Sequence, residues 1–380
     1  MFSGPFMREQ KLHGYFILLC IASMGSILQI IGGNWDVTSH LLLQPETFFT
    51  PSHTLLYGGI LLLSISALIA VFFFKKENEI RNDPLSLSLK FLIIGSALSI
   101  VSGPSDFVWH GVFGVDGFLS PTHLLLISGM LINSIGTVMG LIRMNSCLKD
   151  QPANRVNGIF LVIGFIALWI NLITYVYIFS LPISNGELFN FNLPPFLESI
   201  IALVFLPLIN SFIILLTINT FKKFGYTSLV GIGVIVLNSF STILPSQELS
   251  AFLPYYLLSA VPIIIIDLIV YDKLPFRGKT SNMKYSSIFA GAIAGALFYM
   301  IGYPLLPLAL GDYLMPLNLS AMGFTTLVDI IPNFVNSFAT VFPLTLVIGA
   351  AVGLITSIAY GQVQVYITNR MQTRLKLNDK

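Results

Sequence analysis

The sequence predicts an all-α fold, a polytopic transmembrane helix bundle of about ten spans. Three observations support this prediction. Hydrophobic residues form 55% of the 380-residue chain and charged residues only 9%, whereas soluble domains carry about a quarter charged residues. Apolar runs of about 20 residues recur along the chain, and each is long enough to cross a bilayer. The Lys and Arg residues fall on alternate connections between these runs.

The candidate spans divide the chain into two regions. They cover residues 14–33, 52–74, 85–104, 122–143, 156–180, 196–220, 227–245, 250–271, 285–306 and 335–360. We expect the first four to form two repeated helix hairpins in a metal-binding region at 1–150. The other six form a further transmembrane helical region at 151–380. In the ninth span, Ser287, Gly291 and Gly295 recur every four residues, which predicts close packing against another helix.

The distribution of basic residues predicts the orientation of the chain. Connections after even-numbered spans, the two tails and Lys90 hold all 19 Lys and Arg residues, and connections after odd-numbered spans hold none. By the positive-inside bias, both termini are cytoplasmic in the cell membrane and the first and third connections face outside. This topology accounts for the basic residues, so the expected partner is the lipid bilayer and no nucleic acid.

Four of the five histidines belong to two copies of one motif, 70 residues apart. In each copy an Asp is followed by His four residues later and by a second His thirteen residues after the first. An acidic residue lies between the two histidines. The first set is Asp36, His40 and His53, with Glu46 between the histidines; the second set is Asp106, His110 and His123, with Asp116 between them. This register indicates a duplication that kept its polar residues.

The motif predicts a helix hairpin bent at the outer membrane surface. Thr50-Pro51 and Ser120-Pro121 are typical helix starts, with a hydroxyl N-cap and Pro at the first helical position. The Asp and the first His are four residues apart, so in a helix they share one face. The second His falls in the first turn of the next helix. The two histidines of each copy should therefore converge, with the Asp nearby.

Two histidines and one carboxylate form a ligand set for copper, iron or zinc. Glu46 and Asp116 are candidate further ligands or supports for the ligands. The sequence leaves open whether the two sets form one shared centre or two separate sites. Ionisable groups inside a membrane are costly and are usually functional. The alternative interpretation is a structural hydrogen-bond lattice that pins the two hairpins together.

A pair of haems, held as in a membrane cytochrome, is a further alternative. It needs one straight helix per copy, because thirteen residues of helix separate two histidines by about 20 Å. The chain breaks such helices with Pro and Gly between the histidines and at the next helix start: Pro45 and Pro51 in the first copy, and Gly111, Gly114, Gly117 and Pro121 in the second. The sequence therefore disfavours haem.

The spacing resembles the copper ligand set of the C subunit of the particulate methane and ammonia monooxygenases. Asp36, His40 and His53 match the first carboxylate–His–His set of that family. His110 matches the leading His of its second set, and His123 matches the trailing His with an offset of about one residue. Where the family has an amide, this chain has Asp106, and it adds about six C-terminal spans. The resemblance covers only residues 14–143.

That resemblance implies a copper-binding oxidoreductase component with a small-molecule substrate and other membrane subunits as partners. Two other functions stay open from the residues alone. One is a metal transporter or metal-delivery protein, for which Asp267 in the eighth span and Glu198 near the start of the sixth are candidate polar groups. The other is a structural accessory subunit. Intramembrane amides such as Asn210 and Asn238 are expected to form interhelical hydrogen bonds.

Overall fold

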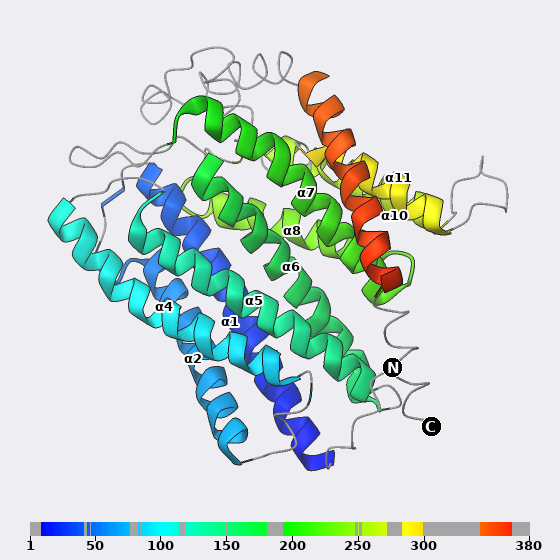
Figure 1. The fold of residues 1–380 in the computed structure, drawn as a ribbon. Coiled ribbons are helices and arrows are strands. Elements are labelled where there is room, and N and C mark those ends of the chain that lie inside the picture. The colour runs from blue at the N-terminus through cyan, green and yellow to red at the C-terminus, as the bar shows by residue number, and fades with distance from the viewer. Residues whose placement is uncertain are drawn as a thin grey trace.

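The computed structural model describes most of the chain, and its regular elements are helices (Figure 1). The described residues are 9–41, 44–45, 47–76, 83, 85–113, 119–148, 151–180, 193–247, 250, 253–271, 283–298 and 343–366. No strand occurs among them. The predicted all-α membrane bundle is thus confirmed in outline, because eight described helices are long and apolar enough to cross a membrane.

The helices follow the predicted spans closely. They are α1 (Glu9–Leu41), α2 (Pro51–Lys76), α4 (Leu85–Phe113), α5 (Pro121–Cys147), α6 (Ala153–Ser180), α7 (Pro195–Phe221), α8 (Tyr226–Ile243), α9 (Leu253–Leu258), α10 (Ala260–Val270), α11 (Met283–Ala296) and a C-terminal helix (Pro343–Tyr366). The spanning helices are α1, α2, α4 to α8 and the C-terminal helix. The described part of the predicted eighth span is divided into α9 and α10 by a turn at Ser259. The count of ten spans stays a prediction.

The first hairpin (α1 and α2) and the second hairpin (α4 and α5) are the most closely packed helix pairs. Each closes over glycines at positions 70 residues apart. A Cβ added to Gly59 would lie 2.6 Å from the backbone nitrogen of Gln29, and one added to Gly129 would lie 2.9 Å from the backbone carbonyl oxygen of Gly95. Only a residue without a side chain allows backbones this close.

The two hairpins contact the rest of the bundle through α1 and α5, both of which pack against α6. Helix α1 contacts α5, α6 and α8 as well as α2. Amides inside the bundle form the expected interhelical bonds: Trp169 Nε1 donates to Asn210 Oδ1 at 2.8 Å, and Ser96 Oγ donates to Asn133 Oδ1 at 3.4 Å. In Figure 1 the hairpins occupy one side of the bundle, and α7, α10, α11 and the C-terminal helix the other.

The second half of the chain contains two further close contacts. A Cβ on Gly291 would lie 3.1 Å from the Gly353 carbonyl oxygen of the C-terminal helix, which confirms the close packing predicted for the small-residue run. The buried Asp267 carboxylate on α10 accepts hydrogen bonds from the backbone N–H and the hydroxyl of Ser228, at 3.1 and 2.8 Å. Because Ser228 lies in the first turn of α8, this carboxylate meets the positive end of that helix.

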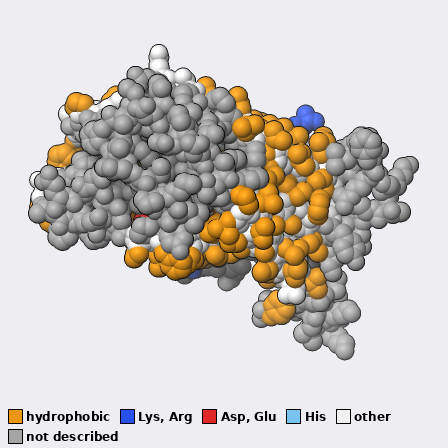
Figure 2. Space-filling view, turned by 90° about the horizontal axis from the view of Figure 1, so that it is seen from above, with side chains coloured by type: hydrophobic (Ala, Val, Ile, Leu, Met, Phe, Trp, Pro, Cys, Tyr) orange, Lys and Arg blue, Asp and Glu red, His pale blue; other side chains and the backbone are white. Residues whose placement is uncertain are grey.

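The outer surface of the bundle is apolar. Hydrophobic side chains dominate the described part of the face shown in Figure 2. On α4, large hydrophobic side chains are more than half exposed: Ile100, Val101, Phe107, Val108 and Val112. In a water-soluble protein such a surface would associate, whereas in a bilayer it contacts lipid. The environment of this chain is therefore a membrane.

Candidate metal centre

Two helices carry the second set, α4 and α5, and α5 begins where the motif predicts. Asp106 and His110 lie four residues apart near the C-terminal end of α4. His123 lies in the first turn of α5, which starts at Pro121 and has Ser120 as its N-cap; Ser120 Oγ accepts the His123 backbone N–H at 3.2 Å. The expected break at Gly111 is wrong, because α4 continues to Phe113. A single Gly lowers helix stability without ending a helix.

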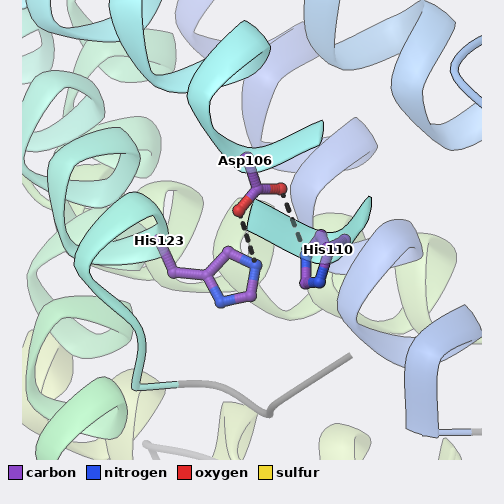
Figure 3. A group of neighbouring side chains, drawn as sticks. All are labelled: Asp106, His110 and His123. Carbon is purple, nitrogen blue, oxygen red and sulfur yellow. Dashed lines mark ion pairs between the residues drawn. The ribbon is translucent and has the colours of Figure 1, made fainter. Parts of the chain in front are cut away.

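Asp106 lies between the two histidines of the second set (Figure 3). His110 Nε2 is 3.4 Å from Asp106 Oδ2, and His123 Nε2 is 3.3 Å from Asp106 Oδ1. One ligand atom from each of the three residues lies within 4.8 Å of the other two. Ligands at about 2.0–2.2 Å from one metal ion are about 3–4 Å apart. A small closure of this cluster would therefore bring its ligand atoms to coordination distances.

Thr122 is a member of the cluster that the sequence analysis did not identify. Its hydroxyl donates to Asp106 Oδ1 at 2.6 Å, and Ser120 Oγ lies 3.2 Å from Thr122 Oγ1. The signal that could have revealed it is positional. A hydroxyl residue follows each Asp by sixteen residues, Ser52 in the first copy and Thr122 in the second.

In the first set, the second His and the two hydroxyl residues repeat the contacts of their equivalents. His53 Nε2 lies 2.9 Å from Asp36 Oδ1, and Ser52 Oγ donates to the same oxygen at 2.9 Å. Thr50 Oγ1 in turn lies 3.2 Å from Ser52 Oγ. Asp36 is on α1, which continues to Leu41, and the other three residues lie at the start of α2. The side chain of His40, and all of Glu46 and Asp116, lie outside the described residues.

A backbone carbonyl orients the His53 ring. His53 Nδ1 lies 2.9 Å from the Thr47 carbonyl oxygen, which can only accept a hydrogen bond. A metal bound at Nε2 would leave the single ring proton on Nδ1, where it faces the Thr47 carbonyl oxygen. Metal-ligating histidines are typically held in this way, by a carbonyl or carboxylate on the other ring nitrogen. This contact suits His53 to coordinate through Nε2.

The geometry of the second set does not fit two stacked haems. His110 and His123 lie on different helices, and their ring centroids are 5.4 Å apart. Axial ligands of two separate haems would be further apart, along one helix. The convergence predicted from the Pro and Gly breaks is correct for these two histidines.

The two sets lie at the same end of the bundle and are linked by aromatic side chains. The Phe48 ring, from the bend of the first hairpin, is 5.1 Å from Phe107, which follows Asp106 on α4. Phe48 is also 5.0 Å from Tyr57, which stacks on His53 at 5.7 Å. These distances are typical of favourable aromatic pairs. The rings therefore form a continuous apolar contact between the neighbourhoods of the two sets.

Fold and cluster together define the class of this protein: a helical membrane protein with a carboxylate–histidine cluster near the end of a helix hairpin. Comparisons with protein-family models, with curated proteins and with solved structures find no match to the chain. Any statement on its activity therefore rests on the residues themselves and on the resemblance in their spacing.

Proposed function

We propose that the protein is a membrane metalloprotein in which the two Asp/His sets bind metal, and that it acts as a copper-dependent oxidoreductase component. The observation that supports this best is the second set, in which a carboxylate oxygen and two imidazole nitrogens lie within 4.8 Å of one another. Asp106, His110 and His123 would hold the ion there. Asp36, His53 and, by the motif, His40 would hold it in the first set.

The surroundings favour metal binding over a purely structural lattice. The side chains of the second set are only 11–16% exposed. Grouping ionisable side chains in a membrane protein is energetically costly, and such groups are usually functional. A metal bound between them would neutralise the carboxylate and supply Lewis-acid or redox chemistry. The residues would fix the positions of the ligand atoms, and the aromatic side chains would limit access of water.

The choice of copper and of oxidoreductase chemistry rests on the resemblance to the monooxygenase C subunit. Carboxylate and imidazole ligands also suit iron and zinc. Metal transport is the second candidate, but the Asp267 carboxylate that could line a path already binds the start of α8. That contact favours a structural role for Asp267 and hence the oxidoreductase proposal.

The proposal includes a topology of ten spans with cytoplasmic termini, and two hairpins related by an approximate twofold axis. The one-sided distribution of Lys and Arg and the equivalent contacts of both hairpins support it. Cysteines introduced at Ser184 and Gly311 should react with an impermeant reagent from outside, and cysteines at Asn78 and Asn145 only from inside. Labelling at Asn78 from outside would refute the topology.

Metal analysis of the purified full-length protein tests the function most directly. We expect bound copper, and loss of most of it in a His53→Ala, His123→Ala double variant that still enters the membrane. His13→Ala is the matched control, because His13 is the one histidine outside both motifs. Full metal content in the double variant would contradict the proposal. Transport of metal ions into liposomes that contain the protein, without a redox change of the metal, would favour the transporter.

A further inference from the structure

We propose that Ser52 and Thr122 are positioning residues, each of which holds one oxygen of the ligand carboxylate so that the Asp faces the metal in one orientation. This inference rests on the proposed metal-binding function. The supporting contacts are the hydrogen bonds from Ser52 Oγ to Asp36 Oδ1, at 2.9 Å, and from Thr122 Oγ1 to Asp106 Oδ1, at 2.6 Å.

Both hydroxyls act where water does not compete. Ser52 is 3% exposed and Thr122 is 7% exposed. A hydroxyl that donates to a carboxylate forms a charge-assisted bond, and 2.6 Å lies in the short range typical of such bonds. The hydroxyl therefore adds a second restraint, beside the histidine contacts, on rotation of the carboxylate about its terminal torsion.

The chain itself contains a natural exchange of the two hydroxyl residues. The first copy reads Thr50-Pro51-Ser52 and the second reads Ser120-Pro121-Thr122. Although Ser and Thr have changed places, each pair keeps its hydroxyl–hydroxyl contact at 3.2 Å and its bond to the Asp. What the two copies share at this position is the hydroxyl, not the methyl group of Thr.

In the second copy, helix capping does not explain the Thr122 hydroxyl. Ser120 is the N-cap, and its side chain accepts the His123 backbone N–H. Thr122 lies two residues further into α5, and its hydroxyl bonds to a carboxylate on α4. The two residues therefore have different roles: Ser120 accepts a backbone N–H at the start of α5, and Thr122 donates to the Asp106 carboxylate.

The contact leaves the two carboxylate oxygens with different partners. Oδ1 of Asp106 accepts the Thr122 hydroxyl, while Oδ2 faces His110. A metal bound between the ligands would then meet a carboxylate whose orientation is already fixed. Loss of such an outer partner lowers metal affinity by about 10–100-fold in known sites, which is the effect expected here.

The test uses full-length protein in which one set at a time is disabled. In a His53→Ala background, Cu²⁺ titration reports on the second set. We expect Thr122→Val to weaken Cu²⁺ binding there by about 10–100-fold. The same change should alter the Cu²⁺ hyperfine splitting in the EPR spectrum. Thr122→Ser, which introduces the residue of the other copy, should keep both. In a His123→Ala background, Ser52→Ala and Ser52→Thr provide the mirrored pair.

Two controls separate positioning from folding. Ser120→Ala should lower the melting temperature through loss of the cap. Thr122→Val should lower Cu²⁺ affinity while the melting temperature changes little. The mirrored Ser52 pair decides the question if Thr122→Val does not accumulate. Unchanged Cu²⁺ affinity and EPR spectra in Thr122→Val and Ser52→Ala would overturn the inference while leaving the metal proposal intact. Absence of Cu²⁺ binding in the wild-type chain would overturn both.

Discussion

Near the first set, hydrogen bonds join the end of α1 to the C-terminal half of the chain, whereas the equivalent position near the second set is built differently. Asn34, two residues before Asp36, donates through Nδ2 to Asn238 Oδ1 and Ser241 Oγ on α8, both at 3.2 Å. Just beyond α1, Gln44 Nε2 donates to the Pro245 carbonyl oxygen at 2.9 Å. The ligand-bearing end of α1 is thereby fixed to α8 and the turn that follows it.

The position equivalent to Asn34 in the second copy is Pro104, which carries no amide side chain and lies inside α4. Around it, α4 exposes apolar side chains, and Phe107 and Val108 beside Asp106 are 54% and 61% exposed. The contact distances differ as well. His53 lies 2.9 Å from its Asp, whereas His110 and His123 lie 3.4 and 3.3 Å from theirs. The two copies of the motif thus differ. In the first, the His–Asp distance is shorter and the end of α1 is hydrogen-bonded to α8; in the second, the His–Asp distances are longer and the neighbouring side chains face lipid.

The largest expected effect comes from removing the carboxylate of either set. Asp106 contacts both histidines and Thr122, so Asp106→Ala should lower Cu²⁺ affinity of the second set by more than about 100-fold, beyond the loss typical of outer partners. Asp36→Ala should do the same for the first set. Titration in the two single-set backgrounds measures each effect. If Asp106→Ala weakens only the first set, the assignment of ligands is wrong.

A smaller effect is expected where each hairpin closes. Gly59→Ala and Gly129→Ala should each reduce the free energy of unfolding by about 2 kcal/mol, because the added methyl overpacks a close helix crossing. Gly58→Ala is the matched control, since a Cβ there meets nothing within 4 Å. Unfolding in detergent micelles measures these energies. Similar losses for Gly58 and Gly59 would show that the crossing does not limit stability.

Removing the hydrogen bonds between Asn34 and α8 should affect the first set only. Asn34→Leu deletes two hydrogen bonds to α8 and should cost about 1–2 kcal/mol of stability. We expect Cu²⁺ affinity of the first set to fall by less than in the ligand variants, and affinity of the second set to stay unchanged. Thermal unfolding and Cu²⁺ titration together check this. An equal loss at both sets would mean that the two sets are not held independently.

The smallest effect concerns an ion pair of the second hairpin, at the end opposite Asp106 and the two histidines. Arg143 binds Asp83 through two nitrogens, at 2.8 and 3.1 Å, and Asp83 also accepts the backbone N–H of Leu85 at the start of α4. Arg143→Lys keeps the charge but loses the two-point contact, so it should cost less than about 1 kcal/mol. Cu²⁺ binding should not change. Altered affinity would reveal coupling along the whole hairpin.

Local signals in the sequence were sufficient for the helices and for part of the site. Pro51 and Pro121 mark the helix starts because Pro suits the first helical position. The spacing of Asp106 and His110 places both on one helix face. The spans themselves follow from hydropathy over about 20 residues. Each of these features depends on neighbours within a few residues, so the sequence contains them directly.

Contacts between distant residues could not be derived in the same way. The bonds from Asn34 to Asn238 and Ser241 join positions more than 200 residues apart. The role of Thr122 depends on how the bend brings α5 back to α4. These features arise from packing between helices, which a single sequence does not specify locally.

Pro104 has a mechanical consequence for the second set. Because proline has no N–H, it cannot donate to the Ile100 carbonyl, and its ring crowds the preceding turn. In the next turn Ser105 Oγ donates to the Val101 carbonyl oxygen at 2.7 Å. The last part of α4 is therefore joined to the rest by a softer link than an unbroken helix would provide. Asp106 and His110 lie beyond that link on α4, whereas His123 lies on α5. Under the proposed function, the two histidines of the second set would therefore be joined less rigidly than across an unbroken helix hairpin, and the site could adapt to an ion that changes its coordination number.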